Sequence, residues 1–392
     1  MVRRIRVLEL VTDFAVEGSA GGVGRFAIEL ARALDNTQID RIIGGLWYYN
    51  TPGEIARIQQ LQAEGIKTLI GSRWDERASY LNVYSAFQGL LKALSHDPVD
   101  IIHSHSEFSD FPAVILRHFT HKPALVRTLH NHEWRRRPLL RPFAQMLYPL
   151  VYDIELGISQ HVVESLNRRW VAKWLGRRAV YAPNAIDIKR FELTMSDVSD
   201  LRQALNIPTT AAVVGTVGRL SEQKGYSILL EAVPVILAQE PQTCFLLVGT
   251  GELESELKRQ AQKLGIASHV LFTGPRTDVE ALFRCMDLFV SSSLWEGLPT
   301  VVLESMAASI PVVATNIPGT RDLIQDGISG WLVPPANPRA LGDTIVRALR
   351  NPKLRQTFAH RAKQLVSAFS IETVAAAHVS LYRTLACSRR ML

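Results

Sequence analysis

The chain has 392 residues, of which 47% are hydrophobic and 21% charged, a composition that excludes a disordered or fibrous protein and suits two globular domains. No apolar run reaches the roughly 18 residues that a membrane-spanning helix needs, and the three cysteines are too scattered for a disulfide framework or a zinc site. We therefore expect a cytoplasmic protein that begins with a strand at residues 5–11 and has no signal peptide.

The net charge of +7 is concentrated in the first half of the chain. Basic residues are interleaved there with aromatic ones, as in the arginines at 135–137 and the segment around Trp170 and Trp174. This pattern favours peripheral contact with an anionic inner membrane face or with a phosphate-bearing acceptor, and we expect no nucleic-acid partner. A solvated face that aids solubility is the equal alternative.

Short apolar runs alternate with stretches of helical period along the chain. In the first half this pattern predicts strands at 5–11, 41–46, 100–104, 124–129, 154–158 and 180–181, and helices at 25–34, 53–64, 79–94 and 160–170. After a turn-rich link, strands are predicted at 211–217, 244–248, 270–272, 288–290, 311–314 and 331–333, and helices at 226–238, 253–264, 278–285, 300–309 and 339–349. Two rounds of this alternation predict an α/β protein with two Rossmann-like, doubly wound parallel-sheet domains that face a central cleft. We place these domains at 1–188 and 189–370, with a helix at 371–392 packing back on the first.

Residues 18–24 form a glycine-rich loop between the first strand and a helix that opens at Arg25. Glycines let backbone amides approach a phosphate closely, and a helix N-terminus favours negative charge. A nicotinamide-binding site would need an acidic residue at the end of the second strand, where residues 46–50 are apolar, aromatic or amide. The dehydrogenase interpretation is therefore disfavoured, and a purely structural turn is the alternative.

Two more loops that leave predicted strands carry charged residues. Arg219 and Lys224 follow the first strand of the second half, where a guanidinium fork and an ammonium group can close on one diphosphate. Glu296 stands in the loop of residues 291–299, and Glu304 lies in the helix that begins near Pro299. Backbone amides from Gly297 to Val302 would then face an anion with the helix dipole behind them. The alternative is that these are ordinary loop and helix charges.

The Glu-x7-Glu spacing of Glu296 and Glu304, the Gly-Arg-x4-Lys-Gly segment at 218–225, the glycines at 21–24 and the Pro-Asn-Ala-Ile-Asp segment at 183–187 resemble the family 4 retaining glycosyltransferases. The resemblance covers essentially the whole chain and implies the GT-B fold. It implies that Glu296 contacts the donor sugar, that Glu304 contacts the ribose, and that the two basic residues hold the diphosphate. It further implies donor contacts for Gly21, Gly22, Gly249, Gly251, Glu252, Arg276, Gly297, Leu298, Thr300 and Val301.

Histidines follow two strands of the first half, in His-Ser-His at 103–105 and in His-Asn-His at 130–132. The resemblance implies that His130 hydrogen-bonds the donor sugar or moves a proton, and we place His105 and Asn184 on the acceptor side. His-x-His also suggests a metal site, but no acidic third ligand with supporting spacing is evident. We predict no metal and no other cofactor, because Arg219, Lys224 and a helix terminus supply the positive charge.

Together these residues predict a retaining glycosyltransferase. It would move a hexose-type sugar from a nucleotide diphosphate-sugar to a glycan, lipid-linked or small-molecule acceptor in polysaccharide or glycoconjugate synthesis. Preorganised cations and amides would stabilise the charge that develops on the departing diphosphate. Two alternatives stay open: a GT-B nucleotide-sugar epimerase, and a non-catalytic nucleotide-sugar-binding protein.

Overall fold

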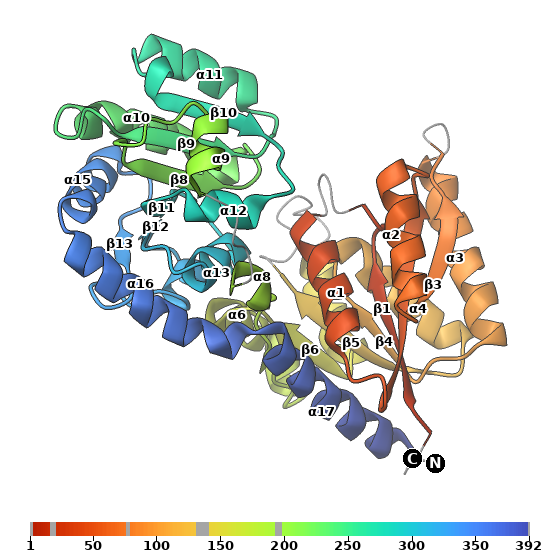
Figure 1. Cartoon of the computed structure of the whole chain (residues 1–392). Helices are drawn as coiled ribbons and strands as arrows, with labels where there is room; N and C mark the ends of the chain where they lie inside the picture. Colours follow the sequence, from red (N-terminus) through yellow and green to blue (C-terminus); the bar gives the residue numbers. More distant parts are fainter. Residues whose placement is uncertain (1–2, 16–20, 76–78, 131–140, 193–197, 391–392) are drawn as a thin grey trace. The chain divides into compact units, whose positions relative to one another are not determined.

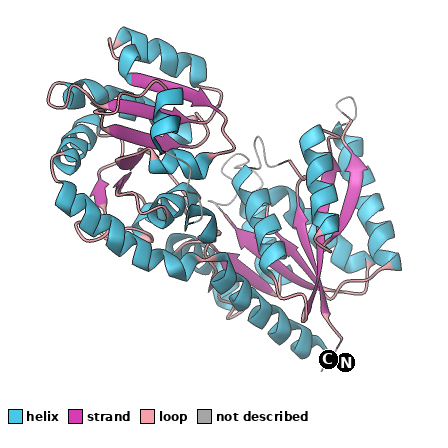
Figure 2. Cartoon of the chain, in the orientation of Figure 1, coloured by secondary structure: helices cyan, strands magenta, loops and turns pink. Residues whose placement is uncertain are grey.

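A computed structural model describes residues 3–15, 21–75, 79–130, 141–192 and 198–390. The chain divides into two compact units (Figure 1): unit 1 comprises Met1–Ile186 and Ile371–Leu392, and unit 2 comprises Asp187–Ser370. In both units helices flank a sheet (Figure 2). Within the described residues, no helix combines the length and apolarity needed to cross a membrane.

Unit 1 is built on a seven-stranded sheet with the order β3-β2-β1-β4-β5-β6-β7, and every ladder described in it is parallel. Its strands are β1 (Ile5–Val11), β2 (Ile39–Tyr48), β3 (Lys67–Arg73), β4 (Ile101–Ser104), β5 (Ala124–Leu129), β6 (Ile154–Gly157) and β7 (Val180–Tyr181). Its helices are α1 (Gly21–Ala33), α2 (Pro52–Ala63), α3 (Ser79–His96), α4 (Glu107–Phe119), α5 (Arg141–Val151), α6 (Gln160–Asn167), α7 (Trp170–Trp174) and α17 (Ile371–Arg390).

The two faces of this sheet have separate cores, because successive strand residues point to opposite faces. Val7, Ile101 and Val126 pack with residues of α1 and α17. Their neighbours along the strands, such as Leu8 and Ile102, pack instead with residues of α3, α4 and α5. The α1 and α17 face therefore also receives Glu9, His103 and Thr128, which share this register.

Unit 2 has a six-stranded parallel sheet with the order β10-β9-β8-β11-β12-β13. Its strands are β8 (Val213–Val217), β9 (Cys244–Val248), β10 (Val270–Gly274), β11 (Leu288–Ser291), β12 (Val312–Thr315) and β13 (Trp331–Val333). Its helices are α8 (Lys189–Glu192), α9 (Val198–Ala204), η1 (Glu222–Lys224), α10 (Tyr226–Leu237), α11 (Glu254–Lys263), η2 (Ala267–His269), α12 (Val279–Arg284), α13 (Thr300–Ala307), α14 (Pro318–Arg321), α15 (Pro338–Leu349), α16 (Pro352–Val366) and η3 (Ser367–Phe369).

The α/β class and the two parallel sheets are confirmed, while several element predictions were incomplete. Strand β3 was missed because it is an edge strand whose side chains are half-buried or exposed. Helix α4 was missed because Pro112 lies inside it, although Ser106 caps its N-terminus with a capping box. Helix α1 begins at Gly21 and not at Arg25, so the last glycines of the loop form its first turn.

Helix α3 approaches strand β3 closely at two glycines. A Cβ atom on Gly89 of α3 would overlap the carbonyl oxygen of Gly71 in β3. We predict that Gly89→Ala lowers the free energy of unfolding by about 1–3 kcal/mol, because it overpacks this contact. The matched control is Gly53→Ala in α2, where no atom lies within 4 Å of the added Cβ; it should gain up to about 1 kcal/mol. Chemical denaturation measures both, and equal effects would contradict the overpacking argument.

Candidate functional site

The order of strands reverses direction once in each sheet, between β1 and β4 in unit 1 and between β8 and β11 in unit 2. At such a switch point the loops after the two strands diverge and leave a crevice at the carboxyl edge of the sheet. Arg219 and Lys224 follow β8, and Glu296 follows β11. His105 follows β4, and His130 follows the adjacent β5. The predicted residues thus lie at the edges where doubly wound sheets bind ligands.

The Glu296 carboxylate is the centre of the unit 2 cluster. The Nζ of Lys224 lies 2.6 Å from its Oε1, and the Ser293 hydroxyl donates to the same oxygen at 2.9 Å. The Gln223 amide donates to Oε2 at 3.1 Å and to the carbonyl of Trp295 at 3.0 Å. The Glu296 side chain is buried and that of Lys224 is mostly so, so this pair is far less screened than a surface ion pair.

Main-chain bonds hold this cluster in place. The amide of Leu294 donates to the carbonyl of Gln223 at 2.8 Å, and the Ser292 hydroxyl donates to the carbonyl of Lys224 at 2.9 Å. Gly225 follows with a φ of 62°, and a Cβ there would overlap the carbonyl of Ser292. Only glycine allows both this conformation and this approach, so the sequence Lys-Gly is what brings Lys224 to Glu296.

Arg219 lies in a different setting from Lys224. Its Nε donates to Glu252 at 3.0 Å, and both side chains are about half exposed. The glycines before Glu252 bring the two loops together, because a Cβ on Gly249 would overlap the Gly218 carbonyl and one on Gly251 the Leu220 backbone. Arg219 and Lys224 therefore each pair with a carboxylate of their own, and their convergence on one diphosphate stays a prediction.

The segment after Glu296 leads into α13. Pro299 is the N-cap residue and Thr300 the first helical residue, so the amides of Thr300 and Val301 belong to the turn that has no partners inside the helix. The amide of Val302 donates to the Pro299 carbonyl at 3.1 Å, which corrects the expectation that it is free. Leu298 and Glu304 are buried, and Gly319 of α14 packs against the Gly297 carbonyl.

The described hydrogen bonds of Arg276 are made outside this cluster. Its guanidinium forms two hydrogen bonds with Asp278, at 2.8 and 2.6 Å. The pair is local in sequence and partly exposed, so a ligand could displace it at little cost. Its predicted role at the nucleotide is neither supported nor opposed by these contacts.

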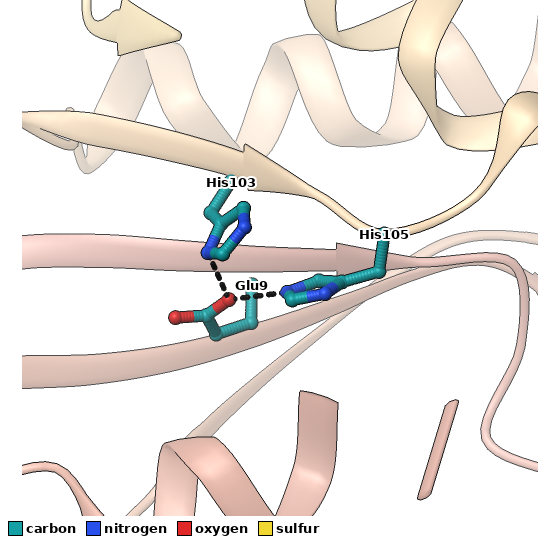
Figure 3. Close-up of side chains that lie close together, drawn as sticks. All are labelled: Glu9, His103 and His105. Carbon is teal, nitrogen blue, oxygen red and sulfur yellow. Dashed lines mark hydrogen bonds and ion pairs between the residues drawn. The ribbon is translucent and has the colours of Figure 1, made fainter. Parts of the chain in front are cut away.

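In unit 1, the carboxylate of Glu9 organises a buried network (Figure 3). Glu9 lies in β1, and its Oε2 is 2.6 Å from the Nε2 of His105 and 3.1 Å from the Nδ1 of His103. The hydroxyl of Tyr382, from α17, donates to Oε1 at 2.9 Å and lies 2.6 Å from His103 Nδ1. His103 Nε2 is 2.7 Å from the Thr128 hydroxyl of β5. Three strands and a C-terminal helix thus meet at one carboxylate.

Burial decides the protonation of this network. Burial alone would raise the pKa of Glu9, but its close contacts with His103 and His105 hold that pKa well below its usual range. Burial lowers the pKa of His103, which Glu9 only partly opposes. It lowers the pKa of His105 to about 4, with a further contribution from His103. The carboxylate is therefore ionised and both imidazoles are neutral at pH 7.

Three buried imidazole nitrogens nearby have no hydrogen-bond partner among the described residues: Nδ1 of His105, Nε2 of His130 and Nε2 of His378. All three rings contact the ring of Phe26 in α1, at centroid distances of 5.9, 5.4 and 6.4 Å. Burial lowers the pKa of His130 well below its usual range, and a side-chain hydrogen bond with Asn184 opposes this only in part. Leaving such an atom unpaired costs about 1–3 kcal/mol, so an uncompensated set of three is unusual.

A metal site was disfavoured because the sequence shows no acidic third ligand for the His-x-His pair. The structure places such an acidic residue, Glu9, beside both histidines. Its carboxylate and donor atoms of His103 and His105 all lie within 4.8 Å of one another. Hydrogen bonds within the network already use these atoms, since His105 Nε2 contacts Glu9 and His103 Nδ1 contacts both Glu9 and Tyr382. The described contacts are those of a proton-sharing network.

Several functional candidates were not found by inspecting the sequence. Glu9 is an acidic residue at a buried position of a mostly apolar strand, which is itself a detectable signal. Gln223 and Ser293 stand inside segments that were singled out, but their partner could not be known without the register of the loops. Tyr382 had no signal at all. Gly21 and Gly22 lie in the first turn of α1, while residues 16–20 and the arginines at 135–137 lie outside the described residues.

Two family models match the chain: Glycosyltransferase Family 4 over residues 20–190 and Glycosyl transferases group 1 over residues 197–365. The D-inositol 3-phosphate glycosyltransferase of Corynebacterium urealyticum is 31% identical over 323 residues, which cover 77% of this chain and 76% of the relative. The lipopolysaccharide core mannosyltransferase LpsB of Rhizobium meliloti is 31% identical over 63% of this chain and 75% of its own. The phosphatidyl-myo-inositol mannosyltransferase of Mycobacterium leprae is 32% identical, over 59% of this chain and 60% of its own.

Solved structures share the fold. The Anabaena protein HepE in complex with UDP and glucose superposes with a TM-score of 0.79 at 22% identity, covering 97% of this chain and all of that one. Sucrose-phosphate synthase from Thermosynechococcus elongatus superposes with a TM-score of 0.80 at 22% identity, covering 98% of this chain and all of that one. Both likenesses extend over both units.

The buried neutral histidines predict an acid-labile fold. A histidine whose pKa falls below the unfolded value of 6.5 on folding stabilises the protein fully above that pH, and this contribution is lost as the pH falls toward 4. His103, His105, His130 and His378 all shift in this direction. We predict that the unfolding free energy falls between pH 7 and pH 4. Each buried histidine contributes a slope of up to about 1.4 kcal/mol per pH unit.

Denaturation at several pH values measures this slope. His378→Leu should reduce the pH slope of the unfolding free energy by the contribution of up to one proton. His118→Gln, at an exposed position of α4, should leave this slope unchanged. A slope that is the same in both variants would contradict the assignment of His378 as a buried neutral group.

Proposed function

The chain belongs to the family 4 glycosyltransferases, and from this premise we propose that it transfers a hexose from a nucleotide diphosphate-sugar to a lipid-linked or glycan acceptor with retention of configuration. The single observation that carries the proposal is the Lys224–Glu296 pair, held by main-chain bonds at the switch point of unit 2. The relatives named above whose names state an activity are all transferases or a synthase. This favours sugar transfer over the epimerase and the non-catalytic alternatives.

The chemistry needs positive charge where the bond to the leaving group breaks. When the anomeric carbon–oxygen bond opens, negative charge develops on the diphosphate, and preorganised cations and amides stabilise it without reorganising. Lys224 is preorganised by its bonds to Glu296 and its burial. The first turn of α13, whose amides at Thr300 and Val301 have no partner inside the helix, adds donors with the helix dipole behind them.

Arg219 supplies a second cation by exchanging its partner. Its pair with Glu252 is exposed, and such pairs contribute only about 0.2–1 kcal/mol. A guanidinium that leaves this carboxylate for a diphosphate gains a doubly hydrogen-bonded contact at small cost. Glu252 is then released to accept a hydrogen bond from the nucleotide, together with the backbone at Gly249 and Gly251.

The two acids of the Glu-x7-Glu segment take different parts of the donor. Glu296 remains paired with Lys224 and offers its Oε2, which only the neutral Gln223 amide contacts among the described bonds, to a sugar hydroxyl. Glu304 lies buried one turn into α13 and binds the ribose hydroxyls. His130 contacts the donor sugar, and Gly21 and Gly22 at the start of α1 approach the donor phosphate.

The reaction needs no metal under this proposal. Lys224, Arg219 and the amides of α13 already supply the charge that a divalent cation would bring to the diphosphate. Among the described residues, the His/Glu group at Glu9 is engaged in its own hydrogen bonds. Arg276 assists the nucleotide after leaving Asp278.

The acceptor is proposed to be amphiphilic, and this suits a site of membrane contact on α7. Trp170 and Trp174, one turn apart on this helix, are 69% and 75% exposed. The neighbouring Arg168, Lys173 and Arg178 are exposed as well. Tryptophan prefers the bilayer interface, and each nearby cation adds about 1 kcal/mol on an anionic surface. Two of the relatives are named for phosphatidyl-myo-inositol and lipopolysaccharide core substrates.

Helix α5 extends this surface. It packs beside α7, and its Met146 and Leu150 are exposed one turn apart. An apolar centre with a basic border matches an anionic lipid surface better than it matches bulk water. We therefore propose peripheral association at the cytoplasmic face of a membrane, which keeps a lipid-linked acceptor within reach.

Lys224→Ala tests the diphosphate contact. We expect turnover to fall by about 100-fold or more, because one preorganised group at the developing charge is lost. Release of UDP or GDP is measured with UDP-glucose and GDP-mannose as donors and lipid extracts as acceptors. Lys258→Ala, which removes an exposed partner of Glu254 in α11, is the control and should retain wild-type rates. Full activity in the Lys224 variant would remove the basis of the proposal.

Replacement of both Trp170 and Trp174 by Ser tests the membrane contact. The wild-type chain should co-sediment with vesicles that contain anionic phosphatidylglycerol more than with neutral phosphatidylcholine, and less at high salt. The double variant should bind about tenfold more weakly or worse, since two large apolar side chains no longer enter the interface. Tyr84→Ser, at an exposed aromatic residue of α3, should bind as the wild type does. Equal binding of all three proteins argues against this surface.

A further inference from the structure

The hydrogen bonds around Glu9 determine where each proton lies. The Tyr382 hydroxyl donates to Glu9 Oε1, so its oxygen accepts from Nδ1–H of His103. The Nε2 atom of the neutral His103 then accepts from the Thr128 hydroxyl. Glu9 Oε2 is a carboxylate oxygen and can only accept, so the Nε2 atom of His105 must carry a proton and donate it.

This assignment leaves a bare lone pair on Nδ1 of His105. A neutral imidazole has one N–H, and His105 uses it toward Glu9. Its Nδ1 is buried and makes no hydrogen bond within the described residues, which do not include 16–20 and 131–140. Buried polar atoms in native proteins are almost always paired, so a specific unpaired one requires a reason. The described part of the chain gives this acceptor no donor.

His105 lies where a donor could come from a ligand. It follows β4 at the switch point, and His130 follows the neighbouring β5. The ring centroids are 5.9 Å apart, and Nε2 of His130 is the second unpaired nitrogen at this edge. The parity of residues 101, 103 and 105 in β4 and of 126, 128 and 130 in β5 places both rings toward α1, where Phe26 contacts both.

We propose that His105 binds a sugar hydroxyl through Nδ1, and that Glu9, supported by Tyr382 and His103, is the positioning residue that fixes its tautomer. The carboxylate behind Nε2–H makes Nδ1 a stronger acceptor and prevents the ring from turning away. The inference rests on the proposed glycosyl transfer for the identity of the ligand. The hydroxyl belongs to the donor sugar or to the acceptor, and the experiment separates these two sources.

Two substitutions at position 105 separate the two nitrogens. The His105→Gln side chain can reach Glu9 with an amide donor, which replaces Nε2–H, but it offers nothing at the place of Nδ1. The His105→Asn side chain carries its Oδ1 near the place of Nδ1 but cannot reach Glu9. A purely structural His105 would tolerate Gln better than Asn. If His105 binds a hydroxyl, the Asn variant should instead retain more ligand affinity than the Gln variant.

Calorimetry with UDP, GDP, UDP-glucose and GDP-mannose measures the affinity for the donor. The KM for lipid-extract acceptors at saturating donor concentration tests a contact with the acceptor. If the hydroxyl is the donor's, His105→Gln should lose about 3- to 10-fold in affinity for the nucleotide-sugar but not for the nucleotide, which is the effect of one neutral hydrogen bond. If it is the acceptor's, the acceptor KM should rise instead by the same factor. His105→Asn should recover most of the loss.

Glu9→Gln tests the positioning role. It should weaken binding of the same substrate that His105→Gln affects. The combined variant should show no further loss of affinity, because the two residues act as a unit. Thermal melting verifies that each variant is folded. Additive losses of affinity would show that Glu9 acts independently of His105 and does not position it.

Three results overturn the inference. Unchanged donor affinity and unchanged acceptor KM in a folded His105→Gln variant exclude a hydroxyl contact. A loss of ligand affinity in His105→Asn that does not occur in His105→Gln shows that His105 has a structural role. Stoichiometric metal in the purified wild-type protein, by mass spectrometry, shows that the network serves as a metal site. Failure of the proposed function is a separate outcome, since the wild-type protein would then bind no nucleotide-sugar.

Discussion

A carboxylate removed from water must be compensated, and this constraint shapes the proposed site in each unit. Desolvating an ionised carboxylate costs several kcal/mol unless hydrogen bonds and opposite charge replace the water. Glu9 in unit 1 accepts hydrogen bonds from His105, just after β4, and from Tyr382 of α17, and His103 of β4 lies 3.1 Å from the same carboxylate. Glu296 in unit 2 obtains Lys224, Gln223 and Ser293 from two loops. In each case the carboxylate ties together segments that are distant in sequence, and it does so at the edge of the sheet where strand order reverses.

The two compensations differ in a way that fits different tasks. Around Glu296 the partner is a cation, so the cluster keeps a positive group close to where a diphosphate is proposed to bind. Around Glu9 the partners are neutral donors, because burial lowers the pKa of His103 and His105. The first arrangement supplies charge, which suits the departure of an anion. The second holds oriented hydrogen-bonding groups with no cation beside the carboxylate, which suits recognition of hydroxyl groups.

The class of fold could be predicted from the sequence because it depends on local periodicity. Strands β1, β5 and β9 lie within runs whose apolar character is unmistakable, and α10 and α15 follow clear helical patterns. Strand β3 could not be predicted in the same way, since an edge strand buries too little to leave a pattern. The start of α1 was misplaced because glycines weaken helix propensity, although the first turn of a helix at a phosphate-type loop tolerates them.

Side-chain partners could be predicted only where a motif constrains them. The Lys-Gly pair at 224–225 and the Glu-x7-Glu spacing led to Lys224 and Glu296, and the structure brings these two together. Nothing local to Glu9 indicates that a tyrosine 373 residues later will donate to it. That contact depends on α17 returning to the α1 face, so it is a property of topology and not of any segment. Tyr382 reaches the same carboxylate that holds His105, so the last helix contributes directly to the buried network beside β4.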